Sequence, residues 1–375
     1  MAKGNFDTKD LKTWVEVSAP NLIGNIHAVR KFVGNSVSVL AVIKANAYGH
    51  GLQGVAGILI KEKGLLCGVD SLIEAKELKN QGIRQPVLIL GYLPGGQLQE
   101  AIQKGFHISI HSLEMLKRVA ALERKLGKKV FGHVKIETGT NRLGIPLAEL
   151  SAYGGPWPVI GAYTHCADTE NVKSNFYKIQ LAAFRQALAI FEARGVGLKY
   201  IHVAATSGLM LHPELHFNAV RLGIGLYGVW PSAEVRRRLE KRLKLKPVLS
   251  WKTRIAQVKH VNAGETVGYD RTYRVGRNRT IAILPIGYYD GYDRRFSNAG
   301  HVVVKGKVAP VIGRVCMNMI MVDITGILAK EGDEALLIGN HPAVTADALA
   351  EIAGTINYEI VTRINPLIPR VVVKK

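Results

Sequence analysis

The stretch that decides the fold runs from Val37 to His50 and reads Val-Ser-Val-Leu-Ala-Val-Ile-Lys-Ala-Asn-Ala-Tyr-Gly-His. Its first half, Val37–Ile43, is an almost uninterrupted apolar run, which predicts one buried strand. Lys44 stands at the end of this strand, before small residues and a glycine that predict a loop. An ammonium group there needs a partner. Without one, its pKa falls and the neutral amine is favoured. A neutral amine in a partly dry pocket suits Schiff-base chemistry. The alternative is a lysine that extends to solvent.

Length and composition bound the class of protein. A chain of 375 residues exceeds the usual size of one core, so two domains are expected. No apolar run is long enough to span a membrane, and the polar N-terminus, Met1–Trp14, lacks the apolar core of a signal peptide. The three cysteines lack metal-ligand spacing. We therefore expect a cytoplasmic protein with reduced thiols, no membrane partner and no metal site.

The net charge of +21 raises the alternative of nucleic-acid binding. The basic residues are spread along the chain, however. The one dense cluster, Arg236–Lys246, is interrupted by leucines and carries no aromatic residues. This pattern favours a solvated helix face or an interdomain linker, so no nucleic-acid partner is expected. A positive field that attracts anions, phosphate cofactors included, is a second interpretation.

Short apolar runs alternate with helix-like segments over the first two thirds of the chain. Eight runs are predicted strands: Val37–Ile43, Leu65–Val69, Val87–Leu90, His107–Ile110, Val130–Ile136, Val159–Tyr163, Tyr200–Val203 and Ala219–Leu222. Between them, Leu72–Leu78 and Leu113–Leu122 have apolar residues at helical spacing, and Ser112 is a plausible N-cap. This alternation predicts a (β/α)8 barrel over residues 14–235. A doubly wound open sheet is the alternative, but no Gly-x-Gly-x-x-Gly follows the first strand.

The remaining residues, 236–375, predict a mainly β domain. Its β-rich runs are Pro247–Val261, Thr280–Ile286, Val302–Val304, Val308–Ile312, Met319–Ile324 and Ala335–Ile338. Glycine turns separate them, and one short helix, Thr345–Ala353, interrupts them. An N-terminal strand at about residues 10–17 could join either domain.

Unusual polar residues fall at the carboxyl ends of five barrel strands. In a barrel, functional side chains gather at that face. Each residue has a structural alternative, such as a core histidine or an arginine paired with a carboxylate, but their convergence favours an active site. The segments are Lys44; Lys135 with Glu137 and Arg142; Tyr163-Thr164-His165; His202 with Ala204–Gly208; and Arg221–Gly225.

These segments resemble the alanine racemase family in order and spacing, over essentially the whole chain. The resemblance begins with the Lys44 motif and continues through Lys135–Gly139, Arg142–Gly144, Tyr163–His165, the His202 segment and Val220–Gly228. The β domain supplies Val267–Tyr273, Ile286–Tyr288, Asp290-Gly291, Gly313–Met317 and Ile356–Glu359.

The resemblance implies a cofactor, pyridoxal 5'-phosphate, attached to Lys44. It implies that the phosphate is held by Tyr48, Thr206 or Ser207, Gly223 and Ile224, with His165 also beside the cofactor. Arg221 would face the pyridine nitrogen. Because a guanidinium stays protonated, it would donate to that nitrogen without protonating it. The ring is then a weaker electron sink, which favours proton exchange at Cα over decarboxylation or transamination.

The resemblance also implies an isomerase that interconverts L- and D-alanine with two bases, Lys44 and Tyr269. A free tyrosine has a pKa of about 10, so cationic neighbours must tune it, and His165 and Arg221 are the candidates. In the family this tyrosine comes from the partner subunit, so a homodimer with shared active sites is implied. The remaining implied roles are carboxylate binding by Arg142 and Met317, a carbamylated Lys135 that orients Arg142, and an entrance lined by Tyr288, Arg314 and Tyr358.

Several positions depart from the common family pattern. They are Glu137 for aspartate, Asn141 for glycine, Ala205-Thr206 for asparagine–serine, Tyr289 for a small residue and Asn318 for aspartate, and the entrance loop with Asp168 and Glu170 aligns loosely. The two bases are unchanged, so the departures bear on substrate breadth more than on reaction type.

Three alternatives share parts of this pattern. A barrel-type decarboxylase of basic amino acids places a carboxylate at the pyridine nitrogen, usually in a Glu-Pro-Gly-Arg stretch, whereas this chain has Ala-Val-Arg-Leu-Gly-Ile-Gly at residues 219–225. A non-catalytic carrier of the cofactor lacks the β domain. A racemase of another amino acid, such as serine, stays open, because one hydroxyl or methylene in a small pocket changes selectivity only modestly.

Overall fold

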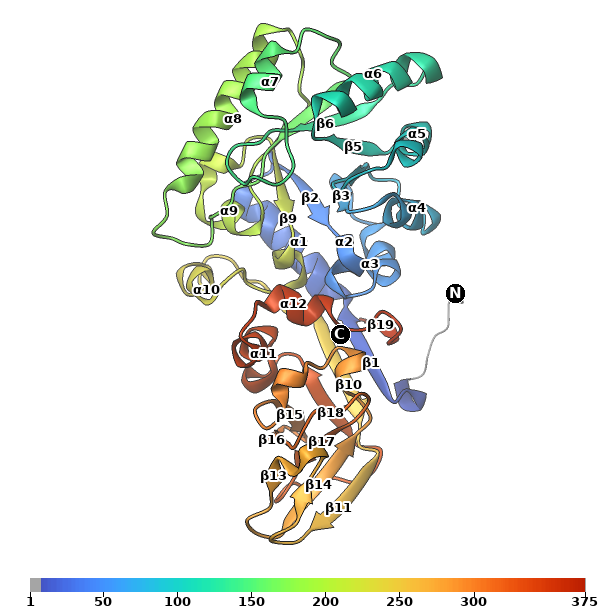
Figure 1. Cartoon of the computed structure of the whole chain (residues 1–375), viewed down its shortest axis with the longest axis vertical. Helices are drawn as coiled ribbons and strands as arrows, with labels where there is room; N and C mark the ends of the chain where they lie inside the picture. Colours follow the sequence, from blue (N-terminus) through green and yellow to red (C-terminus); the bar gives the residue numbers. More distant parts are fainter. Residues whose placement is uncertain (1–7, 375) are drawn as a thin grey trace.

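The computed structural model describes residues 8–374 and divides into a barrel and a β-rich domain, which lie at opposite ends of the long axis (Figure 1). Residues 1–7, part of the N-terminus predicted to lack a signal peptide, lie outside the described residues. Within residues 8–374, no helix is long and apolar enough to cross a membrane.

The predicted (β/α)8 barrel is confirmed. Its eight parallel strands pair in chain order, and the last strand closes onto the first. They are β2 (Ser38–Val42), β3 (Leu65–Val69), β4 (Val87–Ile89), β5 (His107–Ile110), β6 (Phe131–Lys135), β7 (Val159–Tyr163), β8 (Tyr200–His202) and β9 (Ala219–Leu222). Helix α1 (Ala19–Val33) precedes the first barrel strand, and the helices between the strands are α2 (Lys44–Tyr48), α3 (Leu52–Leu59), α4 (Leu72–Asn80), α5 (Gly95–Gln103), α6 (Leu113–Leu126), α7 (Leu147–Ala152), α8 (Phe176–Ala193) and α9 (Thr206–Leu211).

Successive side chains of a barrel strand point to opposite faces of the barrel wall. In β2, Val39 and Ala41 belong to the large core shared with the helices, whereas Leu40 and Val42 belong to a small separate cluster with residues of β3 and β4. That small cluster is the apolar part of the barrel interior. Tyr200 of β8 also belongs to this cluster, whereas the buried polar side chains lie on β5, β6, β8 and β9: His107, Ser109, His133, Lys135, His202 and Arg221. One half of the barrel interior is therefore polar, and this half lies beneath the site described below.

The second domain is built on a nine-stranded sheet with the order β11-β14-β17-β16-β15-β18-β10-β1-β19. The strands are β1 (Thr13–Ser18), β10 (Leu249–Arg254), β11 (Gln257–Val261), β14 (Arg279–Leu284), β15 (His301–Val304), β16 (Lys307–Ile312), β17 (Ile320–Asp323), β18 (Glu334–Ile338) and β19 (Arg370–Val373). A two-stranded ribbon, β12 (Thr266–Val267) with β13 (Tyr273–Arg274), lies beside it. The N-terminal strand β1 pairs with β10 on one side and β19 on the other.

The helices after the barrel differ from the expectation of a single one. Besides α11 (Ala346–Ala353), the chain forms α10 (Ala233–Leu239) and α12 (Asn357–Thr362). Both are short, so their sequences span too few turns to show a helical period. The arginine cluster begins in α10, where Arg236 and Arg238 pair with Glu240 and Glu234 one turn away. This is the solvated helix face that its composition indicated.

Candidate active site

A cavity of about 840 Å³ opens at the carboxyl ends of the barrel strands. A volume of this size is typical of small-molecule sites. It brings together most of the residues singled out from the sequence: Lys44, Tyr48, Lys135, Arg142, His165, Thr206, Ser207, Arg221, Gly223, Ile224 and Tyr358. The cavity therefore lies at the face of the barrel that the polar strand ends indicated.

Lys44 enters the cavity from a left-handed turn rather than from the open loop that the sequence predicted. Residues 45–48 have φ values of 54°, 54°, 54° and 51°. Such a conformation costs about 1–2 kcal/mol per non-glycine residue. Glu74 of α4 helps to hold the turn, because its carboxylate accepts the Asn46 N–H at 3.2 Å. The turn places Lys44 and Tyr48 on the wall of the same cavity.

Asp70, which follows β3, contacts Lys44 and was not predicted. Its carboxylate lies 3.5 Å from the Lys44 amine. Glu74 accepts the Asp70 N–H at 2.9 Å, so one glutamate positions both the lysine turn and its acidic partner. The same strand-end rule that selected Lys44 applies to the end of the third strand, and it could have found Asp70.

Gly223 forms the floor of a cradle suited to an anion. A Cβ at this position would lie 3.0 Å from the Tyr48 hydroxyl and 3.4 Å from Thr206 Oγ1, so only a glycine leaves this space open. The Gly223 N–H donates to Thr206 Oγ1 at 2.9 Å. Burial raises the pKa of Tyr48 to about 12, so its phenol stays a hydrogen-bond donor at neutral pH. Hydroxyls and backbone amides around such a space fit a phosphate group.

Arg221 is only 4% exposed and lies deeper in the barrel. Its guanidinium donates to the carbonyls of Thr164, His202 and Val203, each at 2.8 Å, and to ring nitrogens of two histidines. Burial lowers its pKa to about 10, which still leaves it cationic at neutral pH. The cavity therefore has a fixed cation at its base, where an acceptor nitrogen of a ligand would be recognised.

His165 differs from the expectation of a cationic neighbour. Its Nδ1 lies 3.3 Å from Arg221. Burial and that adjacent guanidinium lower the pKa of His165 to about 3, so the imidazole is neutral at working pH. His165 and Arg221 were expected to lower the pKa of Tyr269 as cations, and of these two groups only Arg221 carries a charge.

Glu137 orders the loop that carries Arg142. Its carboxylate accepts the N–H groups of Gly139, Asn141 and Arg142 at 2.6, 3.0 and 3.3 Å. Asn141 has a φ of 52°, a left-handed conformation that asparagine tolerates better than most residues. The departures at these two positions are therefore accommodated in an ordered loop.

Lys135 lies at the end of β6 and is almost fully buried. Burial, together with Arg142 and Arg221, lowers its pKa to about 8. The neutral amine is the form that adds to carbon dioxide, giving a carbamate and a proton. A carbamate would reverse the charge and supply two acceptor oxygens to a guanidinium.

Crystals grown in air above pH 8 are expected to show a carbamate on Lys135, because most of the amine is then neutral. The measurement is electron density beyond Nζ, and exposed Lys199 serves as the control, which should stay unmodified. A bare amine, or a chloride ion beside it, would contradict the carbamate and leave the rest of the site unaffected.

The cavity mouth carries a contact between the two domains. Tyr358 of α12 donates its hydroxyl to the Glu170 carboxylate at 3.3 Å. Burial and Glu170 raise the pKa of this phenol, so it remains protonated. The loosely aligned segment around Glu170 is thus the barrel's side of the entrance.

Four predicted residues lie outside this cavity, all of them in the β domain. Tyr269 is 70% exposed. Arg314 pairs with Asp270 at 3.1 Å, and Tyr288 donates its N–H to the carbonyl of Cys316, next to Met317. One chain therefore presents two incomplete sets: the barrel cavity, and the β-domain set of Tyr269, Tyr288, Arg314 and Met317.

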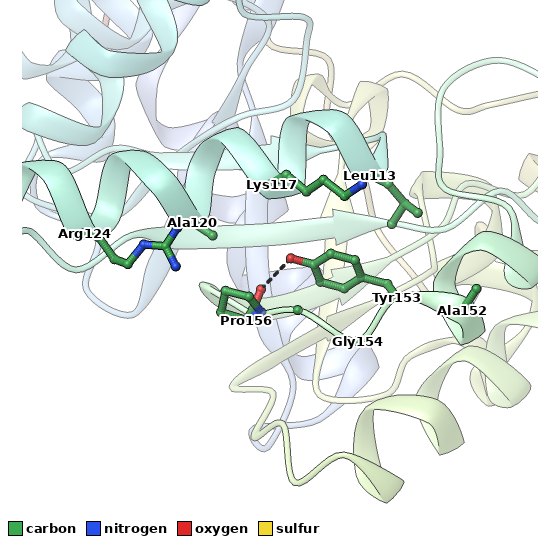
Figure 2. Close-up of a pocket in the computed structure, with 9 residues that line it drawn as sticks. Leu113, Lys117, Ala120, Arg124, Ala152, Tyr153, Gly154 and Pro156 are labelled. Carbon is green, nitrogen blue, oxygen red and sulfur yellow. Dashed lines mark hydrogen bonds between the residues drawn. The ribbon is translucent and has the colours of Figure 1, made fainter.

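A second hollow lies on the outside of the barrel and holds none of these residues. Figure 2 shows it between α6 and the loop that follows α7, where Tyr153 donates its hydroxyl to the carbonyl of Pro156 at 3.1 Å. It is shallow and lined by Lys117 and Arg124 of α6. Among residues 8–374, no group of acidic, histidine or cysteine side chains could hold a metal ion.

Comparisons with known proteins cover both domains. Residues 17–231 match the family "Alanine racemase, N-terminal domain" and residues 248–372 match "Alanine racemase, C-terminal domain". The chain is 39% identical to an alanine racemase of Carboxydothermus hydrogenoformans, over 96% of this chain and 99% of that protein.

Solved structures agree. An alanine racemase from Clostridium difficile 630 superposes with a TM-score of 0.91 at 34% identity, covering 97% of this chain and 96% of that chain. An alanine racemase from Bartonella henselae with covalently bound pyridoxal phosphate gives a TM-score of 0.86 at 27% identity, covering 97% and 100%. In sequence and in architecture, the chain belongs to the alanine racemase family.

Proposed function

We propose that this protein interconverts L- and D-alanine with pyridoxal 5'-phosphate bound at the barrel cavity. One observation carries the proposal: a strand-end lysine, a glycine cradle and a buried guanidinium without an acidic partner among the described residues line one cavity. The close relatives are alanine racemases, and one solved relative holds this cofactor covalently.

The residues present fit the cofactor. Lys44 would attach it, the cradle of Tyr48, Thr206 and Gly223 with Ser207 and Ile224 would hold its phosphate, and Arg221 would face its ring nitrogen. When bound, pyridoxal phosphate supplies an electron sink that acidifies the α-proton of an attached amino acid. Arg142 would bind the substrate carboxylate.

Proton transfer requires a base on each face of the substrate. Lys44 serves one face, because its amine is on the cavity wall. Tyr269 is the proposed base of the other face, and it is exposed on the β domain rather than in the cavity. A homodimer in which each barrel cavity receives the β-domain set of the partner subunit would unite the two. The Met317 amide and the side chains of Tyr288 and Arg314 would arrive with it.

The test is circular dichroism of L-alanine and, separately, L-serine incubated with the holoprotein. We expect the circular dichroism signal of L-alanine to fall to zero, and to do so faster than the signal of L-serine. Faster loss of the serine signal would assign the alternative substrate, and amine release with carbon dioxide would indicate a decarboxylase.

Mixing two inactive variants is expected to restore activity if the site is shared. Lys44→Ala and Tyr269→Phe subunits, allowed to exchange, would form heterodimers with one intact site, built from Lys44 of one chain and Tyr269 of the other. Recovered racemisation is the measurement, and each variant taken alone through the same exchange is the control. Proven exchange without recovery would place both bases in one chain.

A further inference from the structure

A column of three histidines crosses the polar half of the barrel interior and ends on Arg221. His107 Nδ1 lies 3.1 Å from His133 Nε2, and His133 Nδ1 lies 3.0 Å from His202 Nε2. His202 Nδ1 lies 2.8 Å from a guanidinium nitrogen of Arg221. The three rings come from β5, β6 and β8 and are all buried. The column thus connects the cavity to the start of β5, toward the opposite end of the barrel.

The direction of every hydrogen bond in this column follows from its last member. A guanidinium can only donate, so Nδ1 of His202 must accept. The proton of neutral His202 is then on Nε2 and is donated to Nδ1 of His133. By the same step, His133 donates from Nε2 to His107. Burial lowers the pKa of all three rings, that of His107 to about 4, so they stay neutral at working pH.

The column also explains how Arg221 is stabilised. Within residues 8–374 this buried cation forms no ion pair with a carboxylate, although burying an unpaired charge is costly. Carbonyl oxygens and two imidazole lone pairs surround it instead. In the column each imidazole points its acceptor nitrogen toward the guanidinium, so the ring dipoles are aligned. They solvate the charge without neutralising it.

The packing around the column holds the rings in place. His202 stacks on Tyr163 with ring centroids 4.7 Å apart, and His133 stacks on Tyr200 at 5.5 Å. Gly161 of β7 leaves the room that His133 requires, because a Cβ there would lie 2.5 Å from its Nδ1.

We propose that His133 and His107 are positioning residues for the reaction: His133 gives the buried Nε2–H of His202 its acceptor, so that Nδ1 of His202 stays aimed at Arg221 and holds the guanidinium beside the cofactor ring. This rests on the proposed function, because it is the bound cofactor that gives Arg221 its acceptor. The column is not a proton path into the cavity, since a guanidinium does not release its proton at working pH. If the column is broken, the buried Nε2–H of His202 is left without an acceptor, at a cost similar to that of losing the hydrogen bond to Arg221. The His202 ring then divides between arrangements, and in part of the population Arg221 loses its acceptor.

Three variants separate positioning from packing. His133→Leu removes the acceptor of His202, whereas His133→Asn replaces it with an amide oxygen. Gly161→Ala displaces the His133 ring and changes no polar group. Gly197→Ala is its matched control, because a Cβ there meets nothing within 4 Å. Thermal unfolding establishes that each variant is folded.

The first readout is nitrogen–proton NMR of protein with isotope-labelled histidine, recorded without substrate, with the His202 signal assigned by its loss in His202→Gln. Wild type, His133→Asn and Gly197→Ala should show the Nε2–H tautomer of His202. His133→Leu and Gly161→Ala should show a mixture of tautomers. An unchanged His202 tautomer in His133→Leu would overturn the proposal.

The second readout is the ratio of pyruvate release to racemisation of alanine by the holoprotein. Pyruvate forms when the amino group of alanine is left on the cofactor and water supplies the keto oxygen, which a stronger electron sink favours. A guanidinium displaced from the ring nitrogen would leave that nitrogen open to a proton, and a protonated ring is the stronger sink. This ratio should rise roughly 10- to 100-fold in His133→Leu, the effect of losing a hydrogen bond to a charged group. Equal ratios in the leucine and asparagine variants would overturn the proposal. Absence of racemisation in wild type would instead refute the proposed function, and the tautomer measurement would still stand.

Discussion

Lys44→Ala protein is expected to lose alanine racemisation by more than about 10⁴-fold, the upper range for removing one general base. The loss is this large because the substitution removes both the cofactor attachment and the base on one face. Borohydride treatment of the wild-type holoprotein should fix the cofactor to the peptide that contains Lys44, and the variant should show no fixed cofactor. Peptide mass spectrometry and circular dichroism of D- and L-alanine measure the two effects.

Lys61→Ala is the matched control, because Lys61 is an exposed lysine outside the cavity. It should be labelled and active like the wild type. Cofactor fixed to any peptide without Lys44, or full racemisation by Lys44→Ala, would contradict the assignment of this lysine.

Tyr269→Phe protein is expected to lose racemisation in both directions by roughly 10²–10⁴-fold. The two directions fall together because the overall equilibrium between the enantiomers is unchanged. Exchange of the α-proton with deuterium oxide should become unequal. Lys44, which by family resemblance serves the D-enantiomer, still exchanges D-alanine, whereas L-alanine has lost its base. Proton NMR of each enantiomer measures the two exchange rates.

Tyr289→Phe is the control for this substitution, because Tyr289 is also exposed on the β domain. Its exchange rates should match those of the wild type. Equal residual exchange of L- and D-alanine by Tyr269→Phe would show that one base serves both faces, and the two-base mechanism would have to be abandoned.

The barrel was predictable because its strands are largely buried on both faces and therefore appear as short, mainly apolar runs that alternate with helical segments. The cavity residues were predictable for a related reason: parallel strands end at one face, so Lys44, Arg142 and Arg221 had to lie near one another. The left-handed turn after Lys44 was not predictable, because three of its four residues, Ala45, Ala47 and Tyr48, carry no local signal for φ above zero. Its geometry is held by Glu74, a residue 28 positions away from Asn46.

The histidine column was hidden for a different reason. His107, His133 and His202 each look like an isolated polar residue within a strand, and their contacts depend on how far neighbouring strands are staggered. That stagger is a property of the closed barrel, including a register shift between Gly132 and His133. The place of Tyr269 could not be predicted from contacts within one chain, because the cavity that it is proposed to complete belongs to a second copy of the chain.

The position of β1 has a consequence for the order in which this chain folds. The first strand to leave the ribosome is an interior strand of the nine-stranded sheet, between β10 and β19. One of these neighbours begins at Leu249 and the other at Arg370, so both follow the barrel in the chain. The barrel can collapse as soon as its eighth strand is made, whereas one edge of β1 must wait for β10 and the other for β19. Pairings this distant in sequence form slowly, and unpaired strand edges favour aggregation. During synthesis, the most vulnerable strand is therefore β1, because both strands that cover its edges follow the barrel in the chain.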